Sequence, residues 1–328
     1  MQAIIPLAGK GTRLRPHTHT RPKPLLRVGN RPVLDRVLDL LSEAGVDEVI
    51  GVMGHLSGSI ASHIAEHHPD LKFHTVEQVE QLGTADAIRS ARPYVSGPVL
   101  IAFVDTLFEA DMDLIARRPD ADGIIWAKEV EDYQRFGVIV RDAEGFMERI
   151  VEKPTEPISR LANIGLYYIR DHVQLFEGID HVMAQPTKLG EYFLTDAFQY
   201  MIDNGARMLT AEVAEWWDCG KIETLLDTNH RILGSGGDRA PEPSADVVVD
   251  GAVCVADGVV FENSRIGPNV SIGAGSIIRG TELSHCIVGE HSTLENCTLS
   301  QSLVGDYVEA QGLTGTVSLG DHTVVQSG

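Results

Sequence analysis

The sequence of 328 residues has few of the features that mark secreted or membrane-spanning proteins. No apolar run approaches the length of a membrane span, and the first residues lack the charged-then-apolar pattern of a signal peptide. The four cysteines have neither paired nor metal-like spacing: Cys219, Cys254, Cys286 and Cys297. These absences predict a cytoplasmic protein with free thiols.

Positive charge is also scarce. Against 47 Asp and Glu there are 27 Lys and Arg, a formal net charge of −20, which argues against general binding to nucleic acids or anionic membranes. The first acidic residue is nevertheless Asp35, and the N-terminal segment before it has the opposite sign to the whole chain. The basic side chains of this segment are Lys10, Arg13, Arg15, Arg21, Lys23, Arg27 and Arg31.

The basic segment follows a short apolar run, Ile4-Ile5, that is broken by a turn of small residues. Gly9 and Gly11 allow positive φ and a close approach of the backbone to a ligand, and successive N–H groups in such a turn bind anions. Arg13 would add a planar charged fork and Lys23 a point charge. We predict a polyphosphate site at the end of the first strand.

Two common phosphate-binding motifs are absent from this segment. No Gly-Lys-Ser/Thr closes the turn at the spacing of a P-loop, and no glycine follows Gly11 at the spacing of the dinucleotide fingerprint. An exposed basic loop, or a patch for nucleic acid, is the alternative interpretation of the segment alone.

Up to about residue 233, apolar runs alternate with helical patterns, which indicates α/β layering with a mostly parallel sheet. Ligands of such folds bind beyond the carboxyl ends of the strands, where we expect both Gly9 to Arg13 and Asp105. The segment His63 to His67 matches the His-x-x-Glu-His pattern of some zinc proteases, but no third ligand is evident and we expect a solvated helix. The expected elements are helices near 33–41, 59–66 and 85–91 and strands near 49–52, 72–76 and 99–104.

Gln78 and Gly83 lie in the segment Gln-Val-Glu-Gln-Leu-Gly-Thr-Ala-Asp-Ala. A Gln amide can pair with the edge of uracil or thymine, and Gly leaves room for a flat ring. The alternative is that Gly83 and Thr84 only begin a helix, with Thr84 as its cap.

Two carboxylates occur in apolar surroundings. Asp105 follows the apolar residues 100–104, and Asp218 follows Trp216-Trp217. A carboxylate in such a place caps a helix, makes structural hydrogen bonds or binds a hard cation. From the residues alone, capping is the better interpretation of Asp105.

The order of these segments closely resembles the sugar-1-phosphate nucleotidyltransferases, in particular the glucose-1-phosphate thymidylyltransferases and the UTP–glucose-1-phosphate uridylyltransferases. The resemblance covers residues 2 to 233. It departs from the family pattern at Val104-Asp105-Thr106, where many members have Gly-Asp-Asn, and this leaves the expected metal ligand intact. The matching segments are Pro6 to Arg13, Lys23-Pro24-Leu25, Gln78 to Ala87, Tyr133 to Val138, Glu152-Lys153-Pro154, Asn163 to Tyr167, Gly190 to Asp196 and Trp216 to Gly220.

The resemblance implies a role for each candidate residue. Asp105 and Asp218 would hold one Mg²⁺, and the catalytic set would be Arg13, Lys23, Asp105, Lys153 and Asp218. The nucleotide would be bound by Leu7, Ala8, Gly9, Lys10, Gly11, Thr12, Gln78, Gly83 and Thr84. The sugar would be bound by Gly137, Glu152, Lys153, Asn163 and Glu191.

The implied reaction joins glucose 1-phosphate to dTTP or UTP and releases pyrophosphate. A sugar 1-phosphate is largely dianionic near neutral pH and needs no general base, so catalysis would consist of positioning and charge stabilisation. One alternative is a mannose-1-phosphate guanylyltransferase. Another is a catalytically silent, nucleotide-sensing subunit, against which all five catalytic candidates are present.

The composition and the apolar pattern of the sequence change after residue 233. Residues 234–245 are rich in Gly, Ser and Pro and are expected to form a linker. Beyond them Ile266-Gly267, Ile272-Gly273 and Ile278 recur every six residues, which signals a β-helix, with a sandwich as the alternative.

The resemblance therefore implies two domains. Residues 1–233 would form an α/β catalytic domain with a Rossmann-like (GT-A-like) mixed sheet. Residues 246–328 would form a short left-handed parallel β-helix of fewer than about five coils. Because the open ends of a solenoid need covering, we also expect a homo-oligomer.

Overall fold

The structure, a computed structural model, describes residues 1–54, 57–235 and 246–327. The chain divides into two compact units. The first, here the sheet unit, comprises Met1–Gly9 and Val37–Trp216. The second, the coil unit, comprises Lys10–Arg36 and Trp217–Gly328. Of the linker expected at 234–245, residues 236–245 lie outside the described residues.

The sheet unit is built on a nine-stranded mixed sheet, in the order β10-β9-β11-β6-β1-β4-β5, with β8 beside β11 and β12 beside β8. The strands β6, β1, β4 and β5 are mutually parallel, whereas β11 runs antiparallel to β6, β8 and β9. The mixed sheet that the resemblance implied is confirmed, and the mostly parallel sheet expected from the alternation alone is wrong for the second half. The strands are β1 (Gln2–Pro6), β4 (Glu48–Met53), β5 (Lys72–Glu77), β6 (Val99–Ala102), β8 (Gly123–Glu129), β9 (Gly137–Arg141), β10 (Met147–Glu152), β11 (Leu161–Ile169) and β12 (Met208–Glu212).

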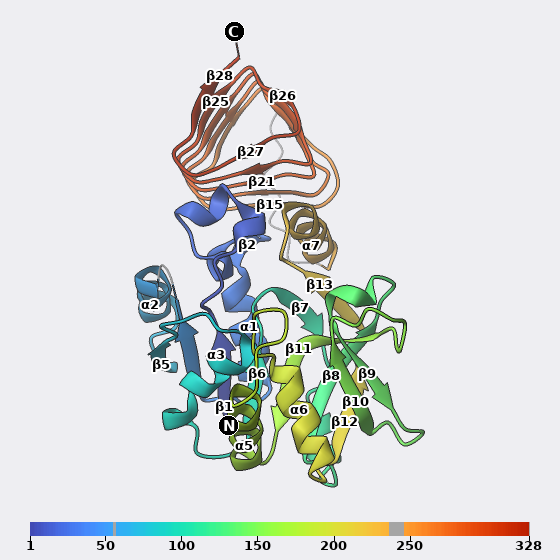
Figure 1. Ribbon diagram of the computed structural model, residues 1–328. Coiled ribbons are helices and arrows are strands. Elements are labelled where there is room, and N and C mark those ends of the chain that lie inside the picture. Colours follow the sequence, from blue (N-terminus) through green and yellow to red (C-terminus); the bar gives the residue numbers. More distant parts are fainter. Residues whose placement is uncertain (55–56, 236–245, 328) are drawn as a thin grey trace. The chain divides into compact units, whose positions relative to one another are not determined.

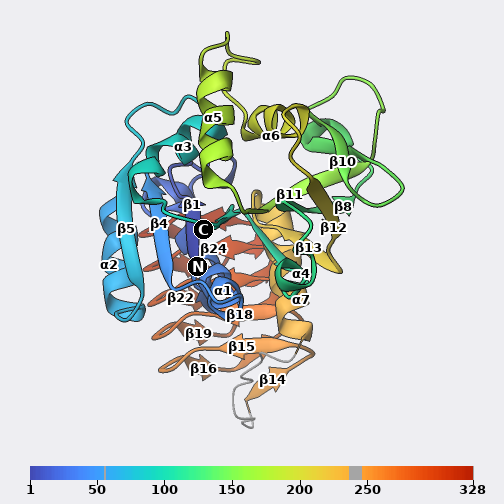
Figure 2. The same ribbon diagram turned by 90° about the horizontal axis from the view of Figure 1, so that it is seen from below.

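Helices cover the sheet. Figure 2 shows α3, α5 and α6 along one face, and their apolar side chains, such as Ile88, Phe176 and Phe198, form one core with Ile4 and Ile101 of the central strands. Short strands β7 (Thr106–Glu109) and β13 (Glu215–Asp218) follow β6 and β12. The helices are α1 (Val33–Glu43), α2 (Ser57–His67), α3 (Thr84–Ser90), α4 (Leu114–Arg117), α5 (His172–Met183) and α6 (Leu194–Asp203).

The C-terminal residues of the coil unit form three parallel sheets of five strands each, which Figure 1 shows as the three sides of a triangular coil. Ile266, Ile272 and Ile278 are fully buried inside it. The left-handed β-helix is therefore confirmed, and the sandwich alternative is wrong. The strands are β14 (Val247–Val249), β17 (Ser264–Ile266), β20 (Glu282–Ser284), β23 (Thr298–Ser300) and β26 (Thr314–Gly315) in the first sheet; β15 (Val253–Val255), β18 (Val270–Ile272), β21 (Ile287–Val288), β24 (Leu303–Val304) and β27 (Ser318–Leu319) in the second; β16 (Val260–Glu262), β19 (Ile277–Arg279), β22 (Thr293–Glu295), β25 (Glu309–Gln311) and β28 (Val324–Gln326) in the third.

The expected number of coils was too low, and the reason is the length of each coil. Three ideal hexapeptides would need about 18 residues. Paired residues are only 17 positions apart at the start of the β-helix, where Val247 faces Ser264. They are 15 positions apart at its end, where Glu309 faces Val324. Shorter corners let five coils fit, and they also explain why the six-residue repeat is irregular in the sequence.

The coil unit also contains α7 (Ile222–Gly234) and a small hairpin of β2 (Arg27–Val28) and β3 (Arg31–Pro32). The two residues between these strands, Gly29 and Asn30, have φ of 54° and 58°. Positive φ at both central residues is the geometry of a tight type I′ hairpin turn.

All four cysteines of the chain are buried, and their sulfur atoms are not joined in disulfides. None of the helices within residues 1–54, 57–235 and 246–327 combines the length and the apolar sequence that crossing a lipid bilayer requires.

Candidate active site

The sheet unit brings several predicted site residues to one edge of its sheet. Because β6, β1, β4 and β5 are parallel, their carboxyl ends lie on the same side. Leu7 to Gly9 follow β1, Gln78 follows β5 and Asp105 follows β6 by three residues. This edge was predicted from the alternation of elements.

The turn after β1 is held by close backbone packing. The N–H of Leu7 donates to the carbonyl of Val52 at 2.8 Å. A side chain on Gly54 would lie 2.7 Å from the Cα of Ala8, so these two backbones touch. The Gln81 amide donates from Nε2 to the Ala8 carbonyl at 2.5 Å. Gly54 and Gln81 were not selected from the sequence, although Gln81 lies within a matching segment.

The Gln78 segment is tied inward. Gln78 is only 7% exposed, and its Nε2 donates to Asp86 Oδ2 at 2.9 Å and to the Gly83 carbonyl at 3.3 Å. Thr84 is the first residue of α3, and its hydroxyl accepts from the N–H of Leu194 at 2.9 Å instead of capping its own helix. A Cβ on Gly83 would lie 2.5 Å from the carbonyl oxygen of Tyr192. The segment around Gln78 and the segment before α6 are therefore locked together.

Three polar side chains converge on Gly137. A Cβ at this position would lie 2.4 Å from Asn163 Nδ2, 2.8 Å from Glu152 Oε2 and 2.9 Å from the Thr195 methyl group. Asn163 Nδ2 donates to the Gly137 carbonyl at 2.8 Å, and the Thr195 hydroxyl donates to Glu152 Oε2 at 3.0 Å. The hydroxyl of Tyr167 donates to Asn163 Oδ1. The structure thus joins three of the predicted sugar-binding residues, together with Thr195 and Tyr167, which had not been selected.

This group, the Gly137 cluster (Gly137, Glu152, Asn163, Tyr167 and Thr195), is electrostatically unusual. Burial raises the pKa of Glu152, while the hydrogen bond from Thr195 and the charge of Lys153 partly oppose the shift. Burial and the nearby carboxylates of Glu152 and Asp105 raise the pKa of Tyr167 well above its usual value. Tyr167 is therefore a neutral donor at physiological pH.

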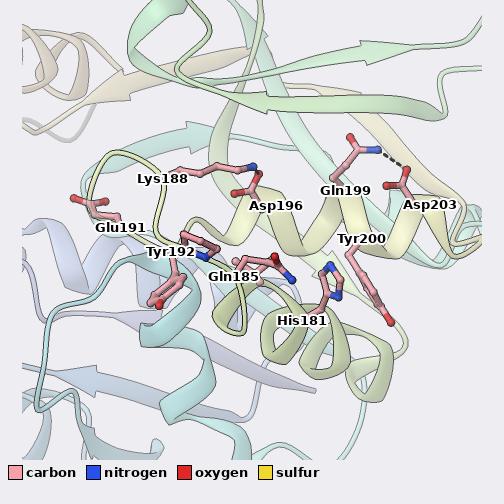
Figure 3. Close-up of a pocket in the computed structure, with 11 residues that line it drawn as sticks. His181, Gln185, Lys188, Glu191, Tyr192, Asp196, Gln199, Tyr200 and Asp203 are labelled. Atoms are coloured by element: carbon pink, nitrogen blue, oxygen red, sulfur yellow. Dashed lines mark hydrogen bonds and ion pairs between the residues drawn. The ribbon is translucent and has the colours of Figure 1, made fainter.

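Lys153 and Glu191 flank this cluster on exposed loops. Lys153 has φ of 44°, and its Nζ lies 4.9 Å from the centre of the Phe193 ring. Glu191 lines a pocket of about 190 Å³ between α5, α6 and the loop that joins them. Figure 3 shows Lys188 of this loop reaching Asp196 of α6, with which it pairs at 2.6 Å. The Glu191 carboxylate also contributes to the raised pKa of Glu152, which places the two near each other.

The other candidate residues belong to the coil unit. Gly11 has φ of 59°, its carbonyl accepts from the Thr18 hydroxyl at 2.8 Å, and a Cβ there would lie 3.1 Å from Cβ of Lys23. Asp218 Oδ1 accepts from the N–H of Gly220 at 2.7 Å. A Cβ on Gly220 would lie 2.7 Å from that oxygen and 3.2 Å from Nη2 of Arg13. Arg13 and Asp218 thus flank Gly220, while Lys10 and Thr12 are exposed beside Arg13.

The basic segment does not act as one cluster. Arg21 pairs with Asp306, and Arg27 pairs with Glu290 at 2.8 Å and with Asp306 at 3.3 Å. These two cations are neutralised by carboxylates of the β-helix. The excess of positive charge before Asp35 therefore has two uses, which the sequence alone did not separate.

Asp105 and Asp218 are both half-buried carboxylates. Carboxylates are ligands that hard cations prefer, usually together with substrate phosphates. Each of the two side chains therefore has the chemistry of a metal ligand.

Comparison with known proteins decides the family. A model of the nucleotidyl transferase family matches residues 2–235. The chain belongs to this family. The low-salt glycan biosynthesis nucleotidyltransferase Agl11 of Haloferax volcanii is 32% identical over 333 residues, covering 93% of this chain and 92% of Agl11.

Two further likenesses agree with this membership. The glucose-1-phosphate thymidylyltransferase of Streptomyces antibioticus is 31% identical, over 92% of this chain and 85% of its own length. A solved UDP-glucose pyrophosphorylase complexed with UDP-glucose has the same fold, with a TM-score of 0.63 at 23% identity, over 71% of this chain and 98% of that chain. This nucleotidyltransferase is therefore an enzyme, as the sequence predicted.

Proposed function

We propose that this nucleotidyltransferase transfers a nucleotidyl group from dTTP or UTP to a sugar 1-phosphate, with glucose 1-phosphate as the favoured acceptor. The observation that carries the proposal is the convergence of Glu152, Asn163 and Thr195 on the backbone of Gly137. A half-buried set of acceptors and donors around a bare backbone suits the hydroxyl groups of a sugar. The names of the thymidylyltransferase and UDP-glucose pyrophosphorylase relatives support the substrate class.

The chemistry needs no covalent intermediate. An oxygen of the sugar phosphate attacks the α-phosphorus in line, a new P–O bond forms, and the bond to the β-phosphate oxygen breaks to release pyrophosphate. Lys153 would hold the attacking phosphate. Arg13 and Lys23, with the backbone N–H groups from Gly9 to Gly11, would hold the triphosphate. Each cation balances charge that shifts between oxygens as the bonds exchange.

The remaining candidates would position the two substrates. Leu7, Ala8, Gln78, Gly83 and Thr84 would form the surface that receives the base. Because the Gln78 Nε2 group already donates to Asp86 and Gly83, the part of its amide that would contact a base is Oε1. A carbonyl oxygen accepts from the N3–H of uracil or thymine, so this role remains compatible with the proposed bases.

Asp105 and Asp218 would hold Mg²⁺. When bound, the ion would neutralise phosphate charge and orient the triphosphate.

The test is pyrophosphate release by the full chain with Mg²⁺. Glucose 1-phosphate and mannose 1-phosphate are each crossed with dTTP, UTP, GTP, ATP and CTP. We expect release with glucose 1-phosphate and dTTP or UTP. Release only with mannose 1-phosphate and GTP would establish the guanylyltransferase instead, and nucleotide binding without release in any combination would establish a silent sensing subunit.

We also propose the division into a catalytic domain over 1–233 and a β-helix over 246–328, a cytoplasmic location, and self-association. The partly buried apolar side chains of the fifth coil, Leu319 and Val325, support self-association, since a second copy would cover them. Light scattering of the purified chain measures the subunit number, and a monomer at all concentrations would refute this part.

A further inference from the structure

The β-helix presents one of its three sides to the segment that carries Arg13 and Lys23. Asn30 donates from Nδ2 to the carbonyls of Cys254 at 3.0 Å and Ile272 at 2.9 Å, in the first and second coils. Arg27 pairs with Glu290, in the third coil, at 2.8 Å.

The contacts continue through the last two coils. Arg21 pairs with Asp306 in the fourth coil. In the fifth, Thr20 donates to Asp321 Oδ2 at 2.8 Å, and His17 Nε2 lies 3.1 Å from the hydroxyl of Ser318. Residues 30 to 17 therefore descend the stack from the first coil to the last, with at least one anchor on every coil.

Coils repeat every ~4.8 Å, so these anchors span about 19 Å. A segment fixed at both ends and between them loses the freedom that an exposed loop has. Lys23 lies between the Arg21 and Arg27 anchors, in a short 3-10 turn over Lys23–Leu25. Arg13 lies in an earlier 3-10 turn over Thr12–Leu14, and the Thr18 hydroxyl donates to the carbonyl of Gly11, the residue before this turn.

Asp306 is the central anchor. Its side chain is only 9% exposed, and it faces two guanidinium groups, those of Arg21 and Arg27. Its Oδ1 also accepts from the N–H of Glu290 at 2.9 Å. A buried carboxylate with two cationic partners fixes the position of both. Removing its charge takes this carboxylate from Arg21 and leaves Arg27 paired with Glu290.

We propose that the β-helix is a positioning element for nucleotidyl transfer, with Asp306 as the positioning residue for the segment that binds the triphosphate. This inference rests on the proposed function for the role of Arg13 and Lys23. It assigns the β-helix a part in nucleotide binding in addition to assembly, because each of its five coils holds the basic segment.

The variant that tests this is Asp306→Asn in the full chain. The asparagine has nearly the same size and still offers an oxygen to the N–H of Glu290, but it lacks the negative charge of Asp306. We expect the dissociation constants for dTTP and UTP to rise at least about tenfold, while KM for glucose 1-phosphate changes less than about twofold. Amide hydrogen exchange of residues 10–31 should accelerate, and Asp306→Glu should partly restore both measurements.

The matched control is Glu295→Gln. Glu295 and Glu262 pair with Arg279 at 3.2 and 3.1 Å on a different side of the β-helix. Like Asp306→Asn, this variant removes one of the two carboxylates that pair with an arginine. It should leave nucleotide binding and exchange of residues 10–31 at wild-type values. If Asp306→Asn does not fold, Arg27→Gln removes the ion pairs of Arg27 with Asp306 and Glu290, keeps the Arg21–Asp306 pair and leaves every β-helix residue intact.

Wild-type nucleotide affinity and unchanged exchange of residues 10–31 in Asp306→Asn or Arg27→Gln would overturn the inference. Equal losses for nucleotide and glucose 1-phosphate would also overturn it, because they would indicate general destabilisation. If the wild type transfers no nucleotide to any sugar 1-phosphate, the proposed function fails, whereas the exchange measurement still decides whether Asp306 holds the segment.

Discussion

The Gly137 cluster and the basic segment over residues 10–31 are held in place by different forces. In the cluster, neutral donors contact one another and Glu152, and a glycine lets them approach. In the basic segment, ion pairs with Asp306 and Glu290 anchor the backbone to the β-helix. Neutral hydrogen bonds are insensitive to salt, while partly exposed ion pairs are screened by it. One enzyme thus fixes its two sets of candidate site residues by shape in one region and by charge in the other.

Substitutions at the two carboxylates expected to hold the metal should give the largest effect on activity. They also test whether both regions serve one reaction. Asp105 belongs to the sheet unit and Asp218 to the coil unit. We expect Asp105→Asn and Asp218→Asn each to lower kcat by at least about a hundredfold, because each would lose a carboxylate ligand of the Mg²⁺ that neutralises phosphate charge. Pyrophosphate release with Mg²⁺ measures this. Asp203→Asn, at the exposed end of α6, is the control, and wild-type rates in both site variants would refute the metal assignment.

Gly137→Ala should break the Gly137 cluster alone. The added methyl group would meet Asn163, Glu152 and Thr195 at less than 3.0 Å, so these side chains must move. We expect KM for glucose 1-phosphate to rise about tenfold or more, with nucleotide affinity nearly unchanged. Gly97→Ala is the control, since nothing lies within 4 Å of its added atom. A rise in both constants would mean that the cluster does not act on the sugar alone.

The sequence predicted local structure better than contacts between distant segments. Local patterns located most elements: the expected strand near 49–52 is β4 over Glu48–Met53, and the expected helix near 85–91 is α3 over Thr84–Ser90. Glycine residues, apolar runs and the alternation of apolar and polar residues determine the structure of the segment in which they occur. They can therefore be recognised in each segment by itself.

Contacts between distant segments were not predictable in the same way. The Arg21–Asp306 pair joins residues 285 positions apart, and neither residue belongs to a recognisable motif for pairing. Likewise, Gly54 supports Ala8 only because β1 and β4 are neighbours in the sheet. The basic segment before Asp35 was interpreted through its phosphate site, with Arg13 and Lys23 as the charged groups, and nothing in the sequence indicated that Arg21 and Arg27 pair with the β-helix.

The pH dependence of sugar binding sharpens the same comparison, with a moderate effect. Because burial raises the pKa of Glu152, its carboxylate takes up a proton at a higher pH than an exposed Glu does. The neutral form is a weaker acceptor, so KM for glucose 1-phosphate should rise as pH falls, up to about tenfold for each pH unit below that pKa. Glu152→Gln cannot titrate and should show only the dependence due to the substrate phosphate. The same pH profile in both proteins would exclude Glu152 from sugar binding.

The smallest effect is expected in the basic segment, and it concerns stability. Burial is the main cause that lowers the pKa of His17 from 6.5 to about 4; Arg21 adds to the shift and Asp321 opposes it. As the pH falls, His17 of the unfolded chain therefore binds a proton at a higher pH than His17 of the folded protein does. Stability from this group is complete above pH 6.5 and is lost as pH falls toward 4.

Urea unfolding at two pH values measures this loss. Between about pH 7 and about pH 5, His17 should reduce the free energy of unfolding by about 2 kcal/mol. His17→Gln retains a donor for Ser318 but has no group that takes up a proton in this pH range. Its free energy of unfolding should therefore fall by about 2 kcal/mol less than that of the wild type over the same interval. Equal losses in the two proteins would show that His17 is protonated in the folded state. In that case the contact between the basic segment and the fifth coil would be more open to water than a side chain with 3% exposure implies.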